Sequence, residues 1–144
     1  RTANANLYAI LASGFRADPS ACAIEAVDAQ GGSLYYTWGD LDRASARLAN
    51  LLASLGLAAG ARVAVQVEKS PEALLLYLAT LRAGYVYLPL NTAYQAAELD
   101  YFIGDAEPSL IVCDPSKADG ITALAATSTL RSSGTCRPRG PVMS

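Results

Sequence analysis

Residues Arg62 to Asn91 read RVAVQVEKSPEALLLYLATLRAGYVYLPLN, and this stretch decides the fold class. Valine at alternate positions predicts a strand over Arg62–Val67. Ser70 is placed to cap a following helix, and Gly84 is placed to end it. A second short strand is expected at Tyr85–Leu88. The strand–helix–strand order indicates a βαβ unit with parallel strands, and hence an α/β fold with a mostly parallel sheet and flanking helices.

The segments on both sides continue the alternation of strands and helices. Thr37 is placed to cap one helix, with Asp40 over its first-turn amides, and Thr92 with Gln95 is expected to form a capping box for another. The helix after Thr37 should bury a stripe formed by Leu41, Ala44, Leu48, Leu51, Leu52 and Leu55 and end at Gly56. We expect further strands at Ala21–Val27, Ser33–Tyr36 and Ser109–Cys113, and further helices at Asn6–Phe15, from Thr92 to Ile103, and from Asp114 to near Ala126.

Length and composition limit the possible classes of protein. The 144 residues suffice for one domain with a core, and 52% hydrophobic residues against 17% charged ones argue against disorder. No apolar run is long enough for a membrane helix, and no secretory signal is visible at the start. Up to Ala126 the chain carries eight basic and thirteen acidic residues. This excess of negative charge argues against a nucleic-acid-binding protein.

The cysteine and histidine counts exclude several kinds of site. The chain has no histidine, so Ser-His-Asp and Cys-His nucleophilic schemes are excluded within it. Cys22, Cys113 and Cys136 form no Cys-x-x-Cys pair, so neither a disulfide framework nor a zinc site is indicated. Cys22 and Cys113 lie in apolar runs and are expected to be small core residues. We predict no catalytic residue and no metal ligand in this chain.

Three stretches carry a resemblance to a known family. Leu34–Leu41 (LYYTWGDL), the helix start Ser70–Glu72 and Leu81–Asn91 (LRAGYVYLPLN) occur in the order found at the start of the adenylate-forming superfamily. That superfamily contains acyl-CoA synthetases, luciferases and peptide-synthetase adenylation domains. The resemblance implies the N-terminal part of an adenylate-forming large domain. Without it, Leu81–Asn91 is a helix end, a buried strand and a turn, so these residues are expected to be scaffold.

The amino-acid sequences of four neighbouring segments are more similar to one branch of the superfamily. Glu68–Leu74, Tyr77–Thr80, Leu88–Tyr94 and Glu98–Ile103 look like bacterial malonyl-CoA synthetases, and the resemblance extends from Asn4 to about Ala126. It implies a cytoplasmic ligase of fatty acid metabolism that uses ATP, Mg²⁺ and CoA. Its partners would be malonate or a similar small carboxylic acid, with no nucleic acid and no membrane. The acid pocket, the nucleotide contacts, the Mg²⁺-binding Glu and the catalytic Lys are expected beyond the last residue.

The C-terminal stretch resembles a damaged phosphate-binding loop. The family's Ser/Thr/Gly loop wraps ATP phosphates with backbone N–H groups, short hydroxyl side chains and a cation. Here Cys136 stands where Thr is usual, and the glycine that normally follows is missing. We divide the chain into a partial N-terminal α/β subdomain over 1–126 and an irregular tail over 127–144. The loop residues that match or keep the charge are Ser132, Ser133, Gly134, Thr135, Arg139 and Gly140.

Three functional readings remain from the sequence. The first is the N-terminal part of an acid–CoA ligase that is inactive alone and binds no cofactor tightly. The second is a non-catalytic α/β module or truncated gene product, for which the basic tail is only a solvated end. The third is an amino-acid adenylation module, which shares the same early motifs.

Overall fold

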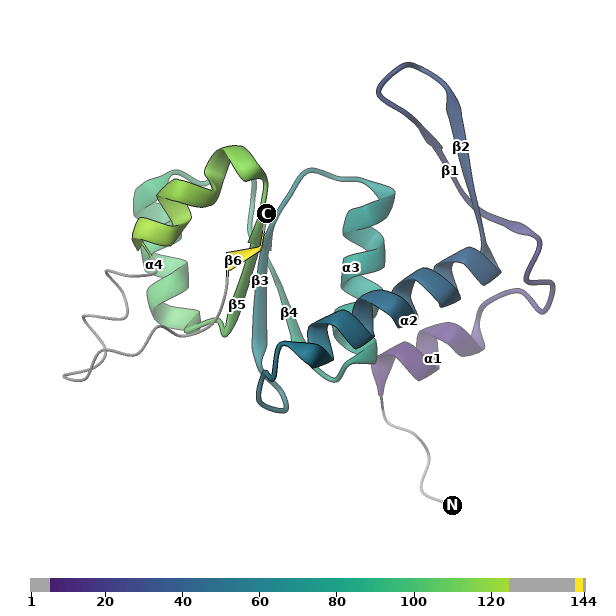
Figure 1. Ribbon diagram of the computed structural model, residues 1–144, viewed down its shortest axis with the longest axis horizontal. Coiled ribbons are helices and arrows are strands. Elements are labelled where there is room, and N and C mark those ends of the chain that lie inside the picture. Colours follow the sequence, from purple (N-terminus) through teal and green to yellow (C-terminus); the bar gives the residue numbers. More distant parts are fainter. Residues whose placement is uncertain (1–5, 125–141, 144) are drawn as a thin grey trace. The chain divides into compact units, whose positions relative to one another are not determined.

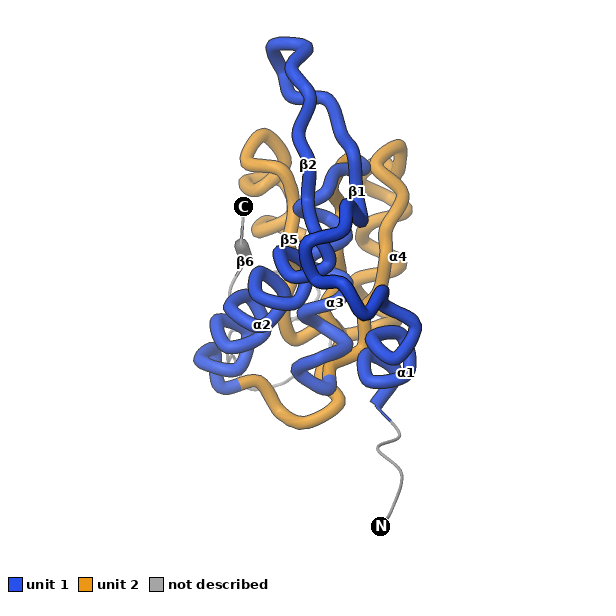
Figure 2. Tube along the Cα trace, turned by 90° about the vertical axis from the view of Figure 1, so that its right-hand side faces the viewer, with its two compact units in different colours: residues 1–56, 69–84 blue, residues 57–68, 85–144 orange. Residues whose placement is uncertain are grey.

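The computed structural model describes residues 6–124 and the backbone of Val142–Met143. The chain forms two compact units, one made of Arg1–Gly56 with Lys69–Gly84 and the other of Leu57–Glu68 with Tyr85–Ser144 (Figure 2). The chain therefore leaves the second unit after the strand that ends near Glu68 and returns to it at Tyr85. We call them the helical unit and the sheet unit.

The helical unit combines a hairpin with three helices (Figure 1). Strands β1 (Cys22–Val27) and β2 (Ser33–Thr37) pair in antiparallel register around a turn at Asp28–Gly32, as the sequence predicts. Helix α3 (Pro71–Arg82) contacts both α1 (Leu7–Ser13) and α2 (Trp38–Ser54).

Local sequence signals set the ends of these helices. The Thr37 cap is confirmed, and the structure completes it to a capping box. Thr37 Oγ1 accepts from the Asp40 N–H at 3.1 Å, and Asp40 Oδ2 accepts from the Thr37 N–H at 2.9 Å. Ser70 Oγ accepts from the Ala73 N–H at the start of α3. Gly84, just past α3, has a φ of +80°, which an L side chain rarely adopts. All three features agree with the sequence analysis.

The buried face of α2 differs from the predicted stripe. Leu41 and Leu52 are buried as expected, but Leu51 is 46% exposed. Ser45 and Ala49 are buried instead. Residues 41, 45, 49 and 52 follow one face of the helix at intervals of three and four residues, so the small Ser45 and Ala49 lie inward while a larger leucine lies on the flank.

The sheet unit is built on four parallel strands. Their order is β4 (Val86–Pro89), β3 (Arg62–Gln66), β5 (Leu110–Cys113) and β6 (Val142–Met143). All neighbouring pairs are parallel, which confirms the expected sheet. Strand β6, paired beside Ile111 and Val112, was not expected in the C-terminal tail. The predicted boundary at 126 lies outside the described residues.

Two helical segments accompany this sheet. Helix α4 spans Ala96–Ala106, and the 3₁₀ turn η1 (Pro115–Lys117) leads into helical residues 118–124. The segment after Asp114 therefore opens as a 3₁₀ turn rather than directly as the expected helix. The buried core of the unit consists of Ala64, Leu90, Leu99, Ile103, Ile111, Cys113 and Ile121.

Two further expectations are corrected. Cys22 is exposed, since it opens a strand with no fully buried position, whereas Cys113 is buried as predicted. The capping box at α4 is formed by Gln95 and Glu98 rather than by Thr92 and Gln95. Glu98 Oε2 accepts from the Gln95 N–H at 2.9 Å. Thr92 precedes the helix and lies in a turn. Among the helices of residues 6–124, none combines the length and hydropathy needed to cross a membrane.

Candidate binding pocket at the carboxyl edge of the sheet

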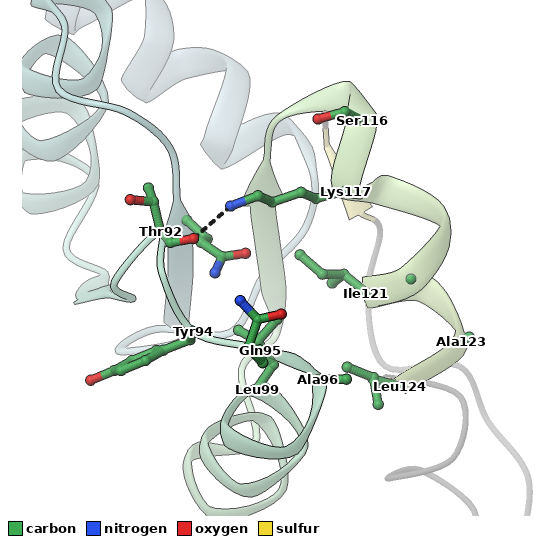
Figure 3. A pocket seen from close by; sticks show the side chains of 12 residues that line it. Thr92, Tyr94, Gln95, Ala96, Leu99, Ser116, Lys117, Ile121, Ala123 and Leu124 are labelled. Atoms are coloured by element: carbon green, nitrogen blue, oxygen red, sulfur yellow. Dashed lines mark hydrogen bonds between the residues drawn. The ribbon is translucent and has the colours of Figure 1, made fainter.

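A pocket of about 450 Å³ lies in the sheet unit (Figure 3). Its walls come from the end of β3, the turn after β4, the start of α4, and the segment after β5. Because parallel strands end at the same edge of a sheet, these segments meet at its carboxyl edge, where α/β folds commonly bind ligands. The pocket is lined by Gln66, Thr92, Tyr94, Gln95, Ala96, Leu99, Ser116, Lys117, Gly120, Ile121, Ala123 and Leu124.

A compact turn forms one wall of the pocket. The Asn91 Oδ1 accepts from the Ala93 N–H at 2.9 Å, and the Asn91 carbonyl accepts from the Tyr94 N–H at 3.1 Å. This local pairing occupies the residues just before α4, so Gln95 rather than Thr92 begins the helix. The turn then presents two consecutive carbonyl groups, those of Asn91 and Thr92, to side chains from other segments.

Two polar side chains hold this turn. Lys117 Nζ donates to the Thr92 carbonyl at 2.8 Å, across the pocket in Figure 3. Gln66 Nε2 donates to the Asn91 carbonyl at 2.9 Å. The two donors come from η1 and β3, so both segments are tied to the same turn.

Gln66 is the most unusual residue of the pocket. It is fully buried, with 0% of its surface exposed. Its Oε1 is also buried and accepts no hydrogen bond from any residue that the structure describes. A buried acceptor left without a donor costs about 1–3 kcal/mol. A buried polar atom of this kind at the wall of a pocket suits a ligand that supplies the donor.

The buried cysteine of the described chain is not a reactive thiolate, and the described acidic and sulfur side chains form no metal centre. Burial raises the pKa of the Cys113 thiol, with a further contribution from the Asp114 carboxylate, so this thiol is protonated near neutral pH. Within residues 6–124, no group of three or more carboxylate, thiol or imidazole side chains is placed to hold a metal ion.

The predicted phosphate-loop residues cannot be placed in this geometry. Ser132, Ser133, Gly134, Thr135, Arg139 and Gly140 all lie outside the described residues, and their role stays a prediction. The described segments that precede and follow them, helical residues 118–124 and β6, both belong to the sheet unit.

The sequence analysis did not single out Gln66 or Lys117. A signal for Gln66 was present, because it is the one polar side chain between Val63 and Val67 in a strand expected to be buried on both faces. Lys117 gave no such signal, since its position after Asp114-Pro115 is typical of a solvated helix start.

Comparison with known proteins decides the family. A family model described as AMP-binding enzyme matches residues 15–139. The chain belongs to the AMP-binding enzyme family. Its α/β architecture matches the N-terminal part of MatB from Rhodopseudomonas palustris: the apo crystal structure has a TM-score of 0.78 and 51% identity over 96% of this chain. The ATP-bound MatB structure is 56% identical over 87% of this chain, with a TM-score of 0.76.

Curated relatives of this chain fall into two kinds. Feruloyl-CoA synthase from Amycolatopsis sp. is 37% identical over 100 residues, or 69% of this chain. A plipastatin synthase protein from Bacillus subtilis is 41% identical over 90 residues, or 62% of this chain. The chain spans about a quarter of MatB, 20% of the feruloyl-CoA synthase and 3% of the plipastatin synthase protein. The family is therefore an adenylate-forming one, and ATP use belongs to it.

Proposed function

We propose that this chain is the N-terminal part of an ATP-dependent acid–CoA ligase that activates malonate or a similar small acid. The observation that carries the proposal is the identity of 51–56% to MatB over 87–96% of the chain. The plipastatin synthase protein and the feruloyl-CoA synthase are less similar to this chain and match shorter stretches of it. The same branch is supported by the resemblance of Glu68–Leu74 and Leu88–Tyr94 to malonyl-CoA synthetase sequences.

The proposed reaction has two steps. The carboxylate of the acid attacks the α-phosphorus of ATP, which forms an acyl-adenylate and releases pyrophosphate. The CoA thiol then forms the thioester and releases AMP. Such chemistry depends on positioning and on stabilisation of charge rather than on a protein nucleophile. It is therefore compatible with a chain that has no histidine and keeps its buried cysteine protonated.

Within this scheme the described residues are scaffold and the tail would contact phosphate. The Ser132, Ser133 and Thr135 hydroxyl groups and the glycine backbone N–H groups would donate to phosphate oxygens, with Arg139 as the cation. The missing glycine after Cys136 shortens the loop and removes one backbone donor. We therefore propose that this chain by itself binds ATP weakly and does not complete the reaction.

An amino-acid adenylation module is the second candidate. It is favoured by the 41% identity to the plipastatin synthase protein. Replacing a segment of a related enzyme with this chain distinguishes the two candidates. A structural segment should support activity best in an enzyme from its own branch of the family.

In the graft, residues 6–124 replace the matching segment of Rhodopseudomonas palustris MatB, and ATP–pyrophosphate exchange is measured with the acids that the parent enzyme uses. The matched control carries the corresponding segment of the plipastatin synthase protein. We expect exchange within about tenfold of the parent for the first graft and a much larger loss for the control. Equal losses in two folded grafts would contradict the assignment to this branch.

A further inference from the structure

The pocket of the sheet unit has polar groups held in a fixed arrangement. Lys117 Nζ and Gln66 Nε2 donate to the carbonyls of two consecutive residues, Thr92 and Asn91. The ammonium and amide ends of the two side chains are therefore anchored to adjacent peptide groups of the same turn. Both residues line the same pocket. The polar groups of the pocket are therefore held by two hydrogen bonds from two different segments.

The hydrogen-bonding capacity of this pair is not used up by the described residues. Of the two polar ends of the Gln66 amide, only the NH₂ group can donate to the Asn91 carbonyl. This contact fixes the orientation of the amide and leaves Oε1 as an acceptor without a donor among the described residues. An ammonium group has three donors, and Lys117 is shown to use one of them, toward Thr92. The pocket therefore contains one buried acceptor without a donor and one cation, both from residues that line it.

The remaining residues that line the pocket indicate the size and polarity of the ligand that it can hold. Leu99 and Ile121 are buried core residues that also line the pocket, and Leu124 packs against that core. Lys117 is the only charged residue among those that line the pocket. The volume of about 450 Å³ suits a small organic molecule.

We infer that this pocket binds a short hydroxycarboxylic acid. The carboxylate pairs with Lys117, the hydroxyl group donates to Gln66 Oε1, and the alkyl chain lies against Leu99 and Ile121. Among the described residues that line the pocket, Lys117 is the one cation, and a single positive charge favours a ligand with a single carboxylate. The inference goes beyond the ligase activity proposed above and does not depend on it, since it is argued only from described residues outside the predicted phosphate loop.

The test uses two acids that differ only in the hydroxyl group, 3-hydroxybutyrate and butyrate. Each is titrated into the ¹⁵N-labelled 144-residue chain, and amide and Gln side-chain NMR shifts give the site and the dissociation constant. We expect shifts centred on Gln66, Thr92 and Gly120, with 3-hydroxybutyrate bound about fivefold more tightly than butyrate, the value of one hydrogen bond.

Three variants make the test specific. Lys117→Met should weaken both acids at least about tenfold, because it removes the charged donor. Gln66→Met should abolish the preference for the hydroxyl acid. Lys69→Met, which changes an exposed lysine outside the pocket, should leave both dissociation constants unchanged.

Several results would overturn the inference. These are the absence of saturable shifts, shifts scattered outside the pocket, equal affinity for the two acids, or a Lys117→Met variant that binds as the wild type does. If Gln66→Met fails to fold, the matched acids and Lys117→Met still decide the question.

Discussion

Arg82 Nη1 lies 2.8 Å from Asp42 Oδ1 and links α3 to α2 in the helical unit. The same nitrogen donates to the Tyr8 hydroxyl of α1 at 2.7 Å, and that hydroxyl donates to Asp42 Oδ1 at 2.8 Å. The guanidinium carbon is 4.6 Å from the centre of the Tyr8 ring. One arginine therefore connects all three helices of the unit.

Arg82→Met should lower the free energy of unfolding by about 1 kcal/mol. The estimate is modest because the side chains of Arg82 and Asp42 are partly exposed, 30% and 58%, and exposed ion pairs contribute little. Urea unfolding followed by the fluorescence of Trp38, the single tryptophan, measures the change. Arg47→Met, at an exposed position of α2, is the matched control and should change stability by less than about 0.5 kcal/mol. An equal loss in both variants would show that the link has no special role.

The same cluster predicts a dependence of stability on acid pH. The hydrogen bond from Arg82, followed by that from Tyr8, lowers the pKa of the Asp42 carboxyl. A carboxyl with a lower pKa in the folded state stabilises it above the unfolded pKa of about 3.9 and loses this contribution as pH falls through the folded value. The stability advantage of wild type over Asp42→Asn should therefore be constant near neutral pH and shrink below about pH 4. Urea unfolding at a series of pH values checks it, and an advantage that grew on acidification would contradict it.

Two glycines should respond to alanine with opposite signs. Gly84 has a φ of +80° and Gly104 lies inside α4, and a Cβ on either would meet nothing within 4 Å. Space is therefore not the deciding factor. Gly84→Ala should destabilise by about 1 kcal/mol, because alanine resists positive φ, whereas Gly104→Ala should stabilise by about 0.5–1 kcal/mol through helix propensity. Thermal unfolding measures both, and a loss of stability in Gly104→Ala would refute the helical account of this position.

The cysteines should differ in reactivity. Cys22 is exposed, while Cys113 is 2% exposed and burial raises its pKa. In a Cys136→Ser background, iodoacetamide at pH 8 should label Cys22 at least about tenfold faster than Cys113, because the thiolate is the reactive form. Peptide mapping by mass spectrometry gives the two rates. Similar rates in the folded protein would mean that the core around Cys113 opens readily.

Local signals in the sequence predicted much of the fold. The Thr37 cap and the Ser70–Gly84 helix depend on neighbouring residues, and the structure confirms both. The Thr92–Gln95 box was wrong because the Asn91 side chain closes a turn that competes with it. Strand β6 was missed because a two-residue strand is defined by its partner β5, far away in the sequence.

The candidate site was less predictable than the fold. Gln66 could have been noticed as a polar residue in a buried strand, but its unpaired Oε1 depends on what surrounds it in space. The partnership between Lys117 and Thr92 joins residues 25 positions apart, which no local pattern encodes. The family resemblance, in contrast, could be recognised from Leu81–Asn91. That stretch is a structural segment, made of a helix end, a strand and a turn.

The central claim is that this chain belongs to a ligase that adenylates malonate. The most direct measurement is malonate-dependent ATP–pyrophosphate exchange by the product of the complete reading frame that contains the chain. L-aspartate and ferulate serve as competing acids, and the 144-residue chain alone serves as the control. The account predicts exchange with malonate at least about tenfold above that with either other acid, and none above background for the chain alone. Preferred exchange with an amino acid or with ferulate, or no exchange by the folded complete product, would contradict it.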